Sequence, residues 1–499
     1  MKMLLNEHIS SKEMKAIELN SQYLGVCKLL LMENAGNGIA QYVKNNYPDK
    51  NNIVIACGLG GNGGDGFVAA RHLASEGYQI EVMLLGKGEH IHSPESEINY
   101  KSLKTMTETV KITEIRDSAD IPPLKSDIII DALIGLGIQG PLRSPYKQMV
   151  EKINTSKAVK ISVDIPSGMN ADAGETYNNS VNPDNLLTFH KRKNGIKKLN
   201  STIIPIGIPP EAITQTGPGD IFLINKPRDQ DSHKGKFGKL LVIGGSENYN
   251  GAPALVGMAA YATGVDICHI AAPESAASII ASYSPSFITT KLKGTRLSGK
   301  NIKKIESLIE RFDAVAIGPG LGDHDETMEA VRQILDKVNK PLVIDADALK
   351  ALVDYDKKLP SNIVLTPHRG EFRILTGKTI EGNINDKETV QKQASKLGAT
   401  ILLKRSRDII SDGKHTRTNH TGNPGMTVGG TGDVLAGITA SYLAMGAGAF
   451  ESACAAAFVS GKAGDVALKD MGYNFEAKDV VDRIPIVIRD CLEGKMVRD

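Results

Sequence analysis

The segment GLGGNGGDG, residues 58–66, is the first part of the chain whose residue types suit ligand chemistry. It follows an apolar run and precedes a helical stretch, so its backbone can approach a phosphate while a helix N-terminus offers free N–H groups. Asn62 and Asp65 add polar side chains to this loop. No Lys-Ser or Lys-Thr pair follows it, which excludes a Walker-type loop. The pattern predicts a phosphate-binding loop, and a ligand-free strand-to-helix turn is the alternative.

Two aspartates close apolar runs further along the first half of the chain. Asp131 precedes a second glycine-rich loop, GLGIQGP, at 135–141, and Asp164 lies in VDIPSG with Ser167 three residues later. Carboxylates at the carboxyl ends of parallel strands face the crevice in which such sheets bind ligands. Oxygens of Asn, Asp and Ser side chains can also coordinate a hard cation. A helix cap is the alternative interpretation for each aspartate.

The second half carries the longest motif, GNPGMTVGGTGDVLAG, at 422–437. Its glycines lead into an apolar helix, so their amides can form an anion hole at the helix N-terminus. Asp433 falls in the first helical turn, where a carboxylate can accept the proton of a hydroxyl that attacks a phosphoryl group. This pattern resembles the small-molecule kinases of the ribokinase-like superfamily, which implies phosphoryl-transfer chemistry.

These loops need parallel strands to position them, and the chain supplies short apolar runs that alternate with helical stretches. The runs are continuously apolar, which predicts strands buried on both faces and therefore parallel sheets with helices on each side. Residues 67–77 are expected to form a helix that ends at a glycine. The expected strands are 52–58, 79–86, 127–135 and 159–168, then 239–246, 265–273, 313–320, 341–349, 362–368 and 400–404.

The chain has 499 residues, which is too long for one ordinary core and predicts two domains. The segment 209–238 is rich in Pro, Gly and charge, so the boundary is placed near 225, giving domains 1–225 and 226–499. The fold class is α/β, with two doubly wound αβα domains, the first Rossmann-like and the second ribokinase-like.

Bulk composition excludes several classes of protein. Lys and Arg number 59 against 57 Asp and Glu, and this net charge of +2 does not favour binding to nucleic acid or to a membrane surface. No apolar run approaches the roughly 20 residues of a membrane helix, and the N-terminus turns polar after Leu5. A cytoplasmic location is therefore expected. Five thinly spread cysteines without a CxxC pair do not favour a disulfide framework or a zinc site.

The motifs of the first half resemble those of the NAD(P)H-hydrate epimerase family over residues 1–220. The family loop usually begins with Asn where this chain has Gly61. The resemblance implies that potassium binds at Asn62, Asp131 and Ser167, and Asp164 is the candidate acid/base. It also implies that the hydrated dinucleotide contacts Gly61, Asn62, Gly63, Gly64, Asp65, Gly135, Leu136, Gly137, Ile138, Gln139, Gly140, Pro141 and Asp164.

Segments of the second half, among them SHKGKFGKLLVIGGS (232–246) and TPHRGEF (366–372), resemble the ADP- or ATP-dependent NAD(P)H-hydrate dehydratases over residues 228–499. The family usually has Lys-Gly where this chain has Lys404-Arg405. The resemblance implies Mg²⁺ with ADP or ATP, and Asp433 as the catalytic base. It implies that Ala252, Gly320, His368 and Asp433 contact the hydrated nucleotide, and that Lys404, Arg405, Ser406, Arg407, Asp408 and Gly432 contact the adenine nucleotide.

Together the halves predict an enzyme that repairs hydrated NADH and NADPH. The first domain would interconvert the R and S epimers, and the second would dehydrate the S epimer. A homo-oligomer is expected, without nucleic-acid or membrane partners. The alternatives are a ribokinase-like kinase for a vitamin-precursor alcohol, or a dehydratase with a non-catalytic N-terminal binding module. The basic run HKRKNGIKK (190–198) is interpreted as a solvated loop, with contact to a ligand phosphate as the alternative.

Overall fold

The computed structural model describes residues 8–138, 140–353, 355, 357, 359 and 362–498. The chain forms two compact units, one that runs to Pro210 and includes Val497, and one from Glu211 to Met496. The division falls at residue 210 rather than near 225 because the helices α6 (Glu211–Thr214) and α7 (Pro218–Ile224) belong to the second unit. There Asp220 of α7 forms a buried ion pair with Arg417.

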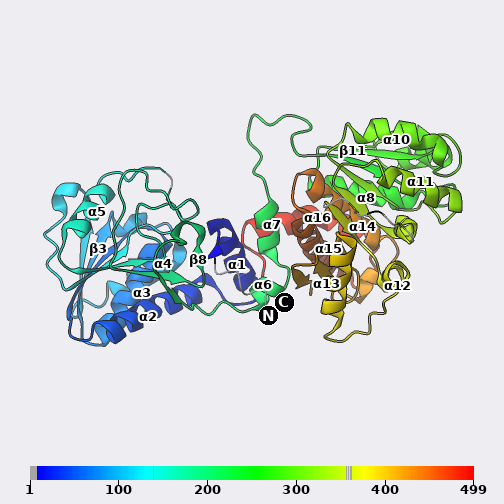
Figure 1. The fold of residues 1–499 in the computed structure, drawn as a ribbon. Coiled ribbons are helices and arrows are strands. Elements are labelled where there is room, and N and C mark those ends of the chain that lie inside the picture. The colour runs from blue at the N-terminus through cyan, green and yellow to red at the C-terminus, as the bar shows by residue number, and fades with distance from the viewer. Residues whose placement is uncertain are drawn as a thin grey trace. The chain divides into compact units, whose positions relative to one another are not determined.

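The first unit is built on a seven-stranded sheet in the order β4-β3-β2-β5-β6-β7-β9, with every pair parallel (Figure 1). The chain direction across the sheet reverses between β2 and β5, which is the point at which open α/β sheets bind ligands. The strands are β2 (Asn52–Cys57), β3 (Gln79–Leu85), β4 (Val110–Ile115), β5 (Ile128–Ala132), β6 (Val159–Val163), β7 (Asn185–Phe189) and β9 (Thr202–Ile204).

Helices cover both faces of this sheet, as its continuously apolar strands predict. Ile53 and Ile55 of β2 belong to a core that includes Phe67 of α3. Val54, between them, faces the opposite side and belongs to a core with Met149 of α5. The helices are α1 (Ser11–Tyr23), α2 (Lys28–Asn46), α3 (Gly61–Ser75), α4 (Pro94–Leu103) and α5 (Tyr146–Thr155).

The N-terminal helix α1 is anchored to the first unit by a short strand. The strand β1 (His8–Ile9) pairs in parallel with β8 (Arg192–Lys193). A capping box between Ser10 and Glu13 then starts α1, with the Glu13 carboxylate accepting from the Ser10 N–H at 2.8 Å. These contacts fix α1 next to the strand that carries Lys193.

The second unit contains a nine-stranded sheet in the order β12-β11-β10-β13-β14-β15-β16-β17-β18 (Figure 1). The pairs from β12 to β16 are parallel, and β17 and β18 add an antiparallel edge. All six expected strands are present with shorter bounds, and β12, β17 and β18 are additional. The strands are β10 (Lys239–Ile243), β11 (Ile267–Pro273), β12 (Ile288–Leu292), β13 (Ala314–Ile317), β14 (Leu342–Ile344), β15 (Ile363–Leu365), β16 (Thr400–Leu403), β17 (Ile409–Ser411) and β18 (Thr416–Thr418).

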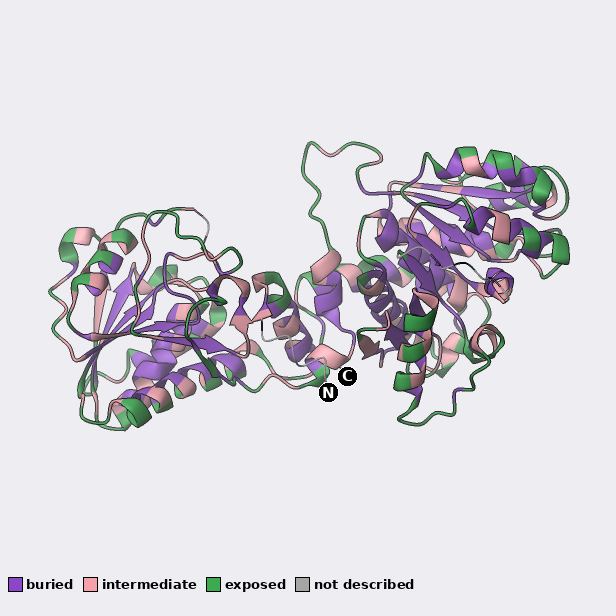
Figure 2. Cartoon of the chain, in the orientation of Figure 1, coloured by how far each residue is buried: buried purple, intermediate pink, exposed green. Residues whose placement is uncertain are grey.

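Helices also cover both faces of the second sheet, and two of them are buried along most of their length (Figure 2). The small residues of α15 pack as expected for residues 451–472. No helix in the described part of the chain is long and apolar enough to cross a membrane. The helices are α8 (Gly251–Thr263), α9 (Glu274–Ser282), α10 (Ile302–Ile309), α11 (Asp325–Leu335), α12 (Arg369–Thr376), α13 (Asp386–Leu397), α14 (Thr431–Ala444), α15 (Ala449–Met471) and α16 (Ala477–Leu492).

The glycine loop after β2 is closely packed and forms the first turn of α3. The helix therefore begins at Gly61 and not at the expected residue 67. A Cβ atom on Gly63 would lie 2.0 Å from the carbonyl oxygen of Gly58. We therefore expect Gly63→Ala to lower the unfolding free energy of this unit by about 1–3 kcal/mol through overpacking. Hydrogen exchange of the β2 amides measures this change.

The same helix offers a matched control for that substitution. A Cβ atom on Gly61 would meet nothing within 4 Å. Gly61→Ala should therefore leave the protection of the β2 amides unchanged or raise it by up to about 1 kcal/mol, because alanine favours a helix over glycine. Equal destabilisation by both substitutions would contradict the close packing of Gly63.

Candidate active sites in the two units

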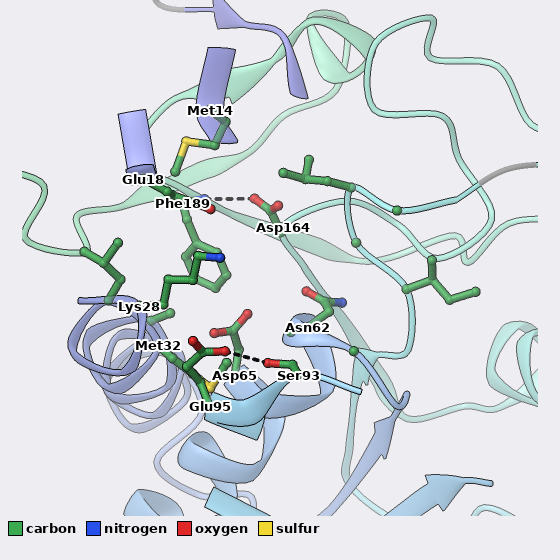
Figure 3. A pocket seen from close by; sticks show the side chains of 18 of the residues that line it. Met14, Glu18, Lys28, Met32, Asn62, Asp65, Ser93, Glu95, Asp164 and Phe189 are labelled. Atoms are coloured by element: carbon green, nitrogen blue, oxygen red, sulfur yellow. Dashed lines mark hydrogen bonds between the residues drawn. The ribbon is translucent and has the colours of Figure 1, made fainter. Parts of the chain in front are cut away.

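A cavity of about 790 Å³ opens in the first unit at the carboxyl ends of its strands (Figure 3). The loops after β2 and β5 form one side, at the reversal point of the sheet. Helices α1 and α2 supply the other side with apolar groups that include Met14, Leu31 and Met32. Of the residues expected to contact the dinucleotide, Gly61, Asn62, Asp65, Gly135, Leu136, Gly137 and Asp164 line this cavity.

The remaining predicted contacts of the first unit lie elsewhere. Gly63 and Gly64 are buried in the first turn of α3, where they allow the loop to approach the strands closely. Ile138, Gly140 and Pro141 follow the cavity-lining part of the second loop. Gln139 lies outside the described residues. The backbone of the first turn of α3 and the loop from Gly135 to Gly137 therefore offer the contact surface for a ligand.

Asp164 sits in a strained position at the end of β6, where three donors reach one oxygen of its carboxylate. Its φ of 65° lies in the left-handed region, which non-glycine residues rarely adopt. One carboxylate oxygen accepts hydrogen bonds from the Phe189 N–H at 3.2 Å and from the Thr188 hydroxyl at 3.2 Å. The Lys193 ammonium donates to the same oxygen. These donors fix the orientation of the Asp164 carboxylate.

Lys193 corrects the interpretation of the basic run 190–198 as a solvated loop. Its side chain is completely buried, and its ammonium pairs with Asp164 and donates to the Phe189 carbonyl oxygen at 3.1 Å. A buried charge requires such partners because desolvation is costly. No local pattern in the sequence distinguishes this buried lysine from the exposed Lys197 and Lys198 nearby.

A second acidic group lies beneath the loops. Asp131 is buried at the end of β5 and accepts from the Ser162 hydroxyl at 2.7 Å and the Ser167 N–H at 3.0 Å. Burial raises its pKa, and no cationic side chain in the described ranges lies within 4 Å of it.

The side-chain nitrogen of Asn62 is buried and has no partner among described residues, and a Cβ atom on Gly135 would lie 3.3 Å from the Asn62 amide oxygen.

Two further carboxyl groups, Glu18 of α1 and Asp65 of α3, line the same cavity (Figure 3). Burial raises the pKa values of both carboxyl groups, and the charge of the Asp164 carboxylate raises these pKa values further. Glu18 was not anticipated because it precedes every recognisable motif. With Asp164 and Glu95, four carboxyl groups line the cavity, together with the buried ammonium of Lys193 and the amines of Lys15 and Lys28.

In the second unit, loops meet where the strand order reverses between β10 and β13. The Gly245 N–H donates to the Pro319 carbonyl oxygen at 2.8 Å. Gly320 has a φ of 68°, and a Cβ atom there would lie 2.9 Å from the Tyr249 carbonyl oxygen. This contact brings Gly320 close to the start of α8, where Ala252 lies. Both predicted residues therefore occupy the ligand-binding point of the sheet.

Asp433 lies in the first turn of α14 and is surrounded by charge. Burial raises its pKa to about 7, Asp345 and Asp347 raise it, and Lys404 lowers it. The Lys404 ammonium donates to the Asp345 carboxylate at 2.8 Å, and a Cβ atom on Gly432 would lie 3.3 Å from this ammonium. Asp345 also accepts from the Thr366 hydroxyl at 2.7 Å. A carboxyl group with a pKa near neutrality suits a general base.

His368 caps the N-terminus of α12. Its Nδ1 accepts from the N–H groups of Gly370 at 2.9 Å and Glu371 at 3.2 Å, while the Glu371 carboxylate accepts from the His368 N–H at 2.8 Å. Nδ1 is therefore an acceptor, and Nε2 carries the proton. The backbone of His368 pairs with that of Lys404, and the Lys404 N–H donates to the Pro367 carbonyl oxygen at 2.8 Å, so this ring lies on the same edge of the sheet.

The segment 404–408 forms the turn between the antiparallel strands β16 and β17. The Arg405 guanidinium is occupied by a buried ion pair with Asp386 at 2.6 Å. Asp408 accepts from the Arg405 N–H at 3.0 Å and from Asn419, and burial raises its pKa to about 6. Ser406 and Arg407 are exposed at the turn. Lys404 is the member of this segment that reaches the charged cluster of Asp433.

The architecture defines an α/β protein in which each unit carries glycine loops, its candidate ligand site, at the carboxyl ends of parallel strands. Residues 240–486 match the family model described as NAD(P)H-hydrate dehydratase, and residues 28–195 match the YjeF-related protein N-terminus. The second unit shares its fold with a ribokinase-like superfamily protein of Enterococcus faecalis, at 26% sequence identity and a TM-score of 0.51, covering 56% of this chain and 96% of that chain.

Relatives match almost the whole chain. The bifunctional NAD(P)H-hydrate repair enzyme of Hyperthermus butylicus is 42% identical, covering 98% of this chain and 94% of its own. That of Pyrobaculum aerophilum is 43% identical, covering 97% of this chain and 98% of its own. The chain belongs to the family of bifunctional NAD(P)H-hydrate repair enzymes.

Proposed function

We propose that this chain repairs hydrated NADH and NADPH, with epimerisation in the first unit and nucleotide-dependent dehydration in the second. Asp433 carries the proposal, because a carboxyl group with a pKa near 7 stands at the N-terminus of a glycine-led helix beside Lys404. A kinase-like site can activate the hydroxyl group of the hydrated ring, since phosphate leaves more readily than hydroxide.

In the dehydration, Asp433 accepts the proton of the ring hydroxyl as its oxygen attacks the terminal phosphoryl group of ADP or ATP. The Lys404 ammonium and the amides at the start of α14 stabilise the charge on the transferring group. The lone pair of the ring nitrogen then expels phosphate, and loss of a neighbouring ring proton restores the dihydronicotinamide. The products are NADH or NADPH, inorganic phosphate and the shortened nucleotide.

Magnesium would enter with the phosphates of the nucleotide, because Mg²⁺ is usually bound by one or two carboxylates together with substrate phosphates. Asp345 lies beside Lys404, and its carboxylate would hold the ion together with the phosphates, while Asp433 acts as the base. Bound there, magnesium would neutralise charge on the phosphates.

In the epimerisation, the hydroxyl-bearing ring carbon is also bonded to the ring nitrogen, so the ring can open to an aldehyde and close on the other face. We assign to Asp164 the acceptance of the hydroxyl proton, and the Lys193 ammonium donates to its carboxylate. The carboxyl groups of Glu18, Asp65 and Asp164 would repel phosphates at their end of the cavity. We therefore assign the uncharged ring to the end of the cavity with Asp164, and the pyrophosphate to the backbone of the glycine loops.

A potassium ion fits the group formed by Asn62, Asp131 and Ser167. The group supplies carboxylate, amide and hydroxyl oxygens, and its carboxylate is buried without a cationic partner in the described ranges. Bound there, the ion would neutralise Asp131 and hold the two glycine loops together. A homo-oligomer and a cytoplasmic location stay predictions.

Separate assays test the two activities. With pure S epimer, Mg²⁺ and ADP or ATP, we expect NADPH and inorganic phosphate to form in equal amounts. A stable phosphorylated product would instead show an ordinary kinase. Without nucleotide, we expect the pure S epimer to equilibrate with the R epimer faster than it does without protein, as followed by chromatography. An unchanged rate would leave the first unit as a binding module.

A further inference from the structure

The cavity of the first unit holds two carboxyl groups in opposite environments. Asp164 receives donors from Phe189, Thr188 and Lys193. Asp65 faces the same cavity, and neither a hydrogen bond nor an ion pair reaches its carboxyl group from any residue in the described ranges (Figure 3). Paired carboxyl groups whose surroundings differ in this way divide into one base and one acid.

The groups around Asp65 favour its neutral form. The Glu18 carboxyl group faces it from α1, Asp164 from the end of β6 and the Cys57 thiol from β2, while the Lys193 ammonium is the cation that acts on it. Lys193 is already bound to Asp164, so its charge is largely neutralised there. Burial and the two nearby carboxyl groups therefore raise the pKa of Asp65 well above the ordinary value.

We propose that Asp65 is the general acid of the epimerisation and Asp164 its general base. The assignment rests on the proposed epimerase function, and it gives each carboxyl group one proton-transfer role. Because Asp65 lies in the first turn of α3 and Asp164 at the end of β6, the two groups approach a ligand in the cavity from different elements.

The ring-opening step balances with these two groups. The Asp164 carboxylate takes the hydroxyl proton, and the electron pair of that O–H bond forms the carbonyl of the aldehyde. The bond between this carbon and the ring nitrogen breaks, and its electron pair accepts the Asp65 proton. Rotation about the adjacent carbon–carbon bond presents the other face of the aldehyde. Reversal of both proton transfers closes the ring to the other epimer and restores both side chains.

The test compares full-length Asp65→Asn with the unmodified chain in the nucleotide-free epimer exchange. Asparagine keeps the size and polarity of Asp65 but cannot transfer its proton. We expect kcat to fall by about 10²–10⁴-fold while KM changes less than about threefold. A raised KM with an unchanged kcat would show that Asp65 only binds the substrate, and would overturn the assignment. Glu76→Gln, at the exposed C-terminal end of α3, is the control and should retain full activity.

A pH profile supplies a second readout that a structural role would not alter. The acid must be protonated, so kcat/KM of the unmodified chain should fall as pH rises through the raised pKa of Asp65. Glu18→Gln removes a group that raises this pKa, and should move the alkaline limb to lower pH. A limb that keeps its position in Glu18→Gln would overturn the assignment. If the unmodified chain catalyses no exchange, the proposed function fails together with the assignment, whereas an active Asp65→Asn variant overturns only the assignment.

Discussion

Replacement of Asp433 by Asn is expected to lower the nucleotide-dependent formation of NADPH from the S epimer by about 10²–10⁴-fold. Asparagine preserves the shape of the first turn of α14 but cannot accept the hydroxyl proton. Asparagine also keeps the size and polarity with which this position contacts the bound ring, so binding of the S epimer should change little. Absorbance of the reduced nicotinamide measures the rate directly.

The pKa of Asp433 adds a prediction about pH to the same experiment. The base acts in its ionised form, and its pKa is raised to about 7. The rate in the unmodified chain should therefore rise with pH through about 7 and level off above it. Asp482→Asn, on the exposed surface of α16, is a matched control that should keep both the rate and the profile. A rate in Asp433→Asn within tenfold of the unmodified chain would contradict the role of this base.

The second large effect is expected from Lys193→Met, which leaves the Asp164 carboxylate buried without its cation. Removal of one partner from a buried ion pair destabilises a protein by about 3–5 kcal/mol. Hydrogen exchange of the amides of β6 and β7, the strands next to this pair, should report the loss. The epimer exchange should fall as well, since the base is no longer held in position.

A double substitution separates the two consequences of that change. Lys193→Met combined with Asp164→Asn removes both charges, so the amides should regain most of their protection while the epimer exchange stays absent. The exposed pair of Lys44 and Glu76 is the control, because Lys44→Met should cost at most about 1 kcal/mol. Full activity in the double variant would contradict the role of Asp164, and full protection in Lys193→Met would contradict the burial of the pair.

Local sequence patterns predicted the strands and the glycine loops well because both depend on neighbouring residues. The apolar runs around Ile55 and Val242 could only be strands buried on two faces. Asp131 and Asp164 were found because a parallel sheet gathers the residues at its carboxyl edge, and the sheet order confirms that arrangement.

The residues that were missed depend on contacts distant in sequence. Lys193 becomes a buried partner of Asp164 only because β8 folds back beside the end of β6. Glu18 reaches the cavity only because the pairing of β1 with β8 anchors α1 there. Asp345 falls within the expected strand 341–349. Its position beside Lys404 requires β14 and β16 to flank β15. No local periodicity encodes these placements.

The most direct test of the account is the recovery of NADPH from an equilibrated mixture of both hydrate epimers, with the full chain, Mg²⁺ and ADP or ATP. We expect complete recovery at an enzymatic rate, because the first unit converts the R epimer while the second consumes the S epimer. Recovery of only the S fraction, followed by a slow phase at the rate of spontaneous epimerisation, would contradict the epimerase role of the first unit. No recovery with either nucleotide would contradict the account as a whole.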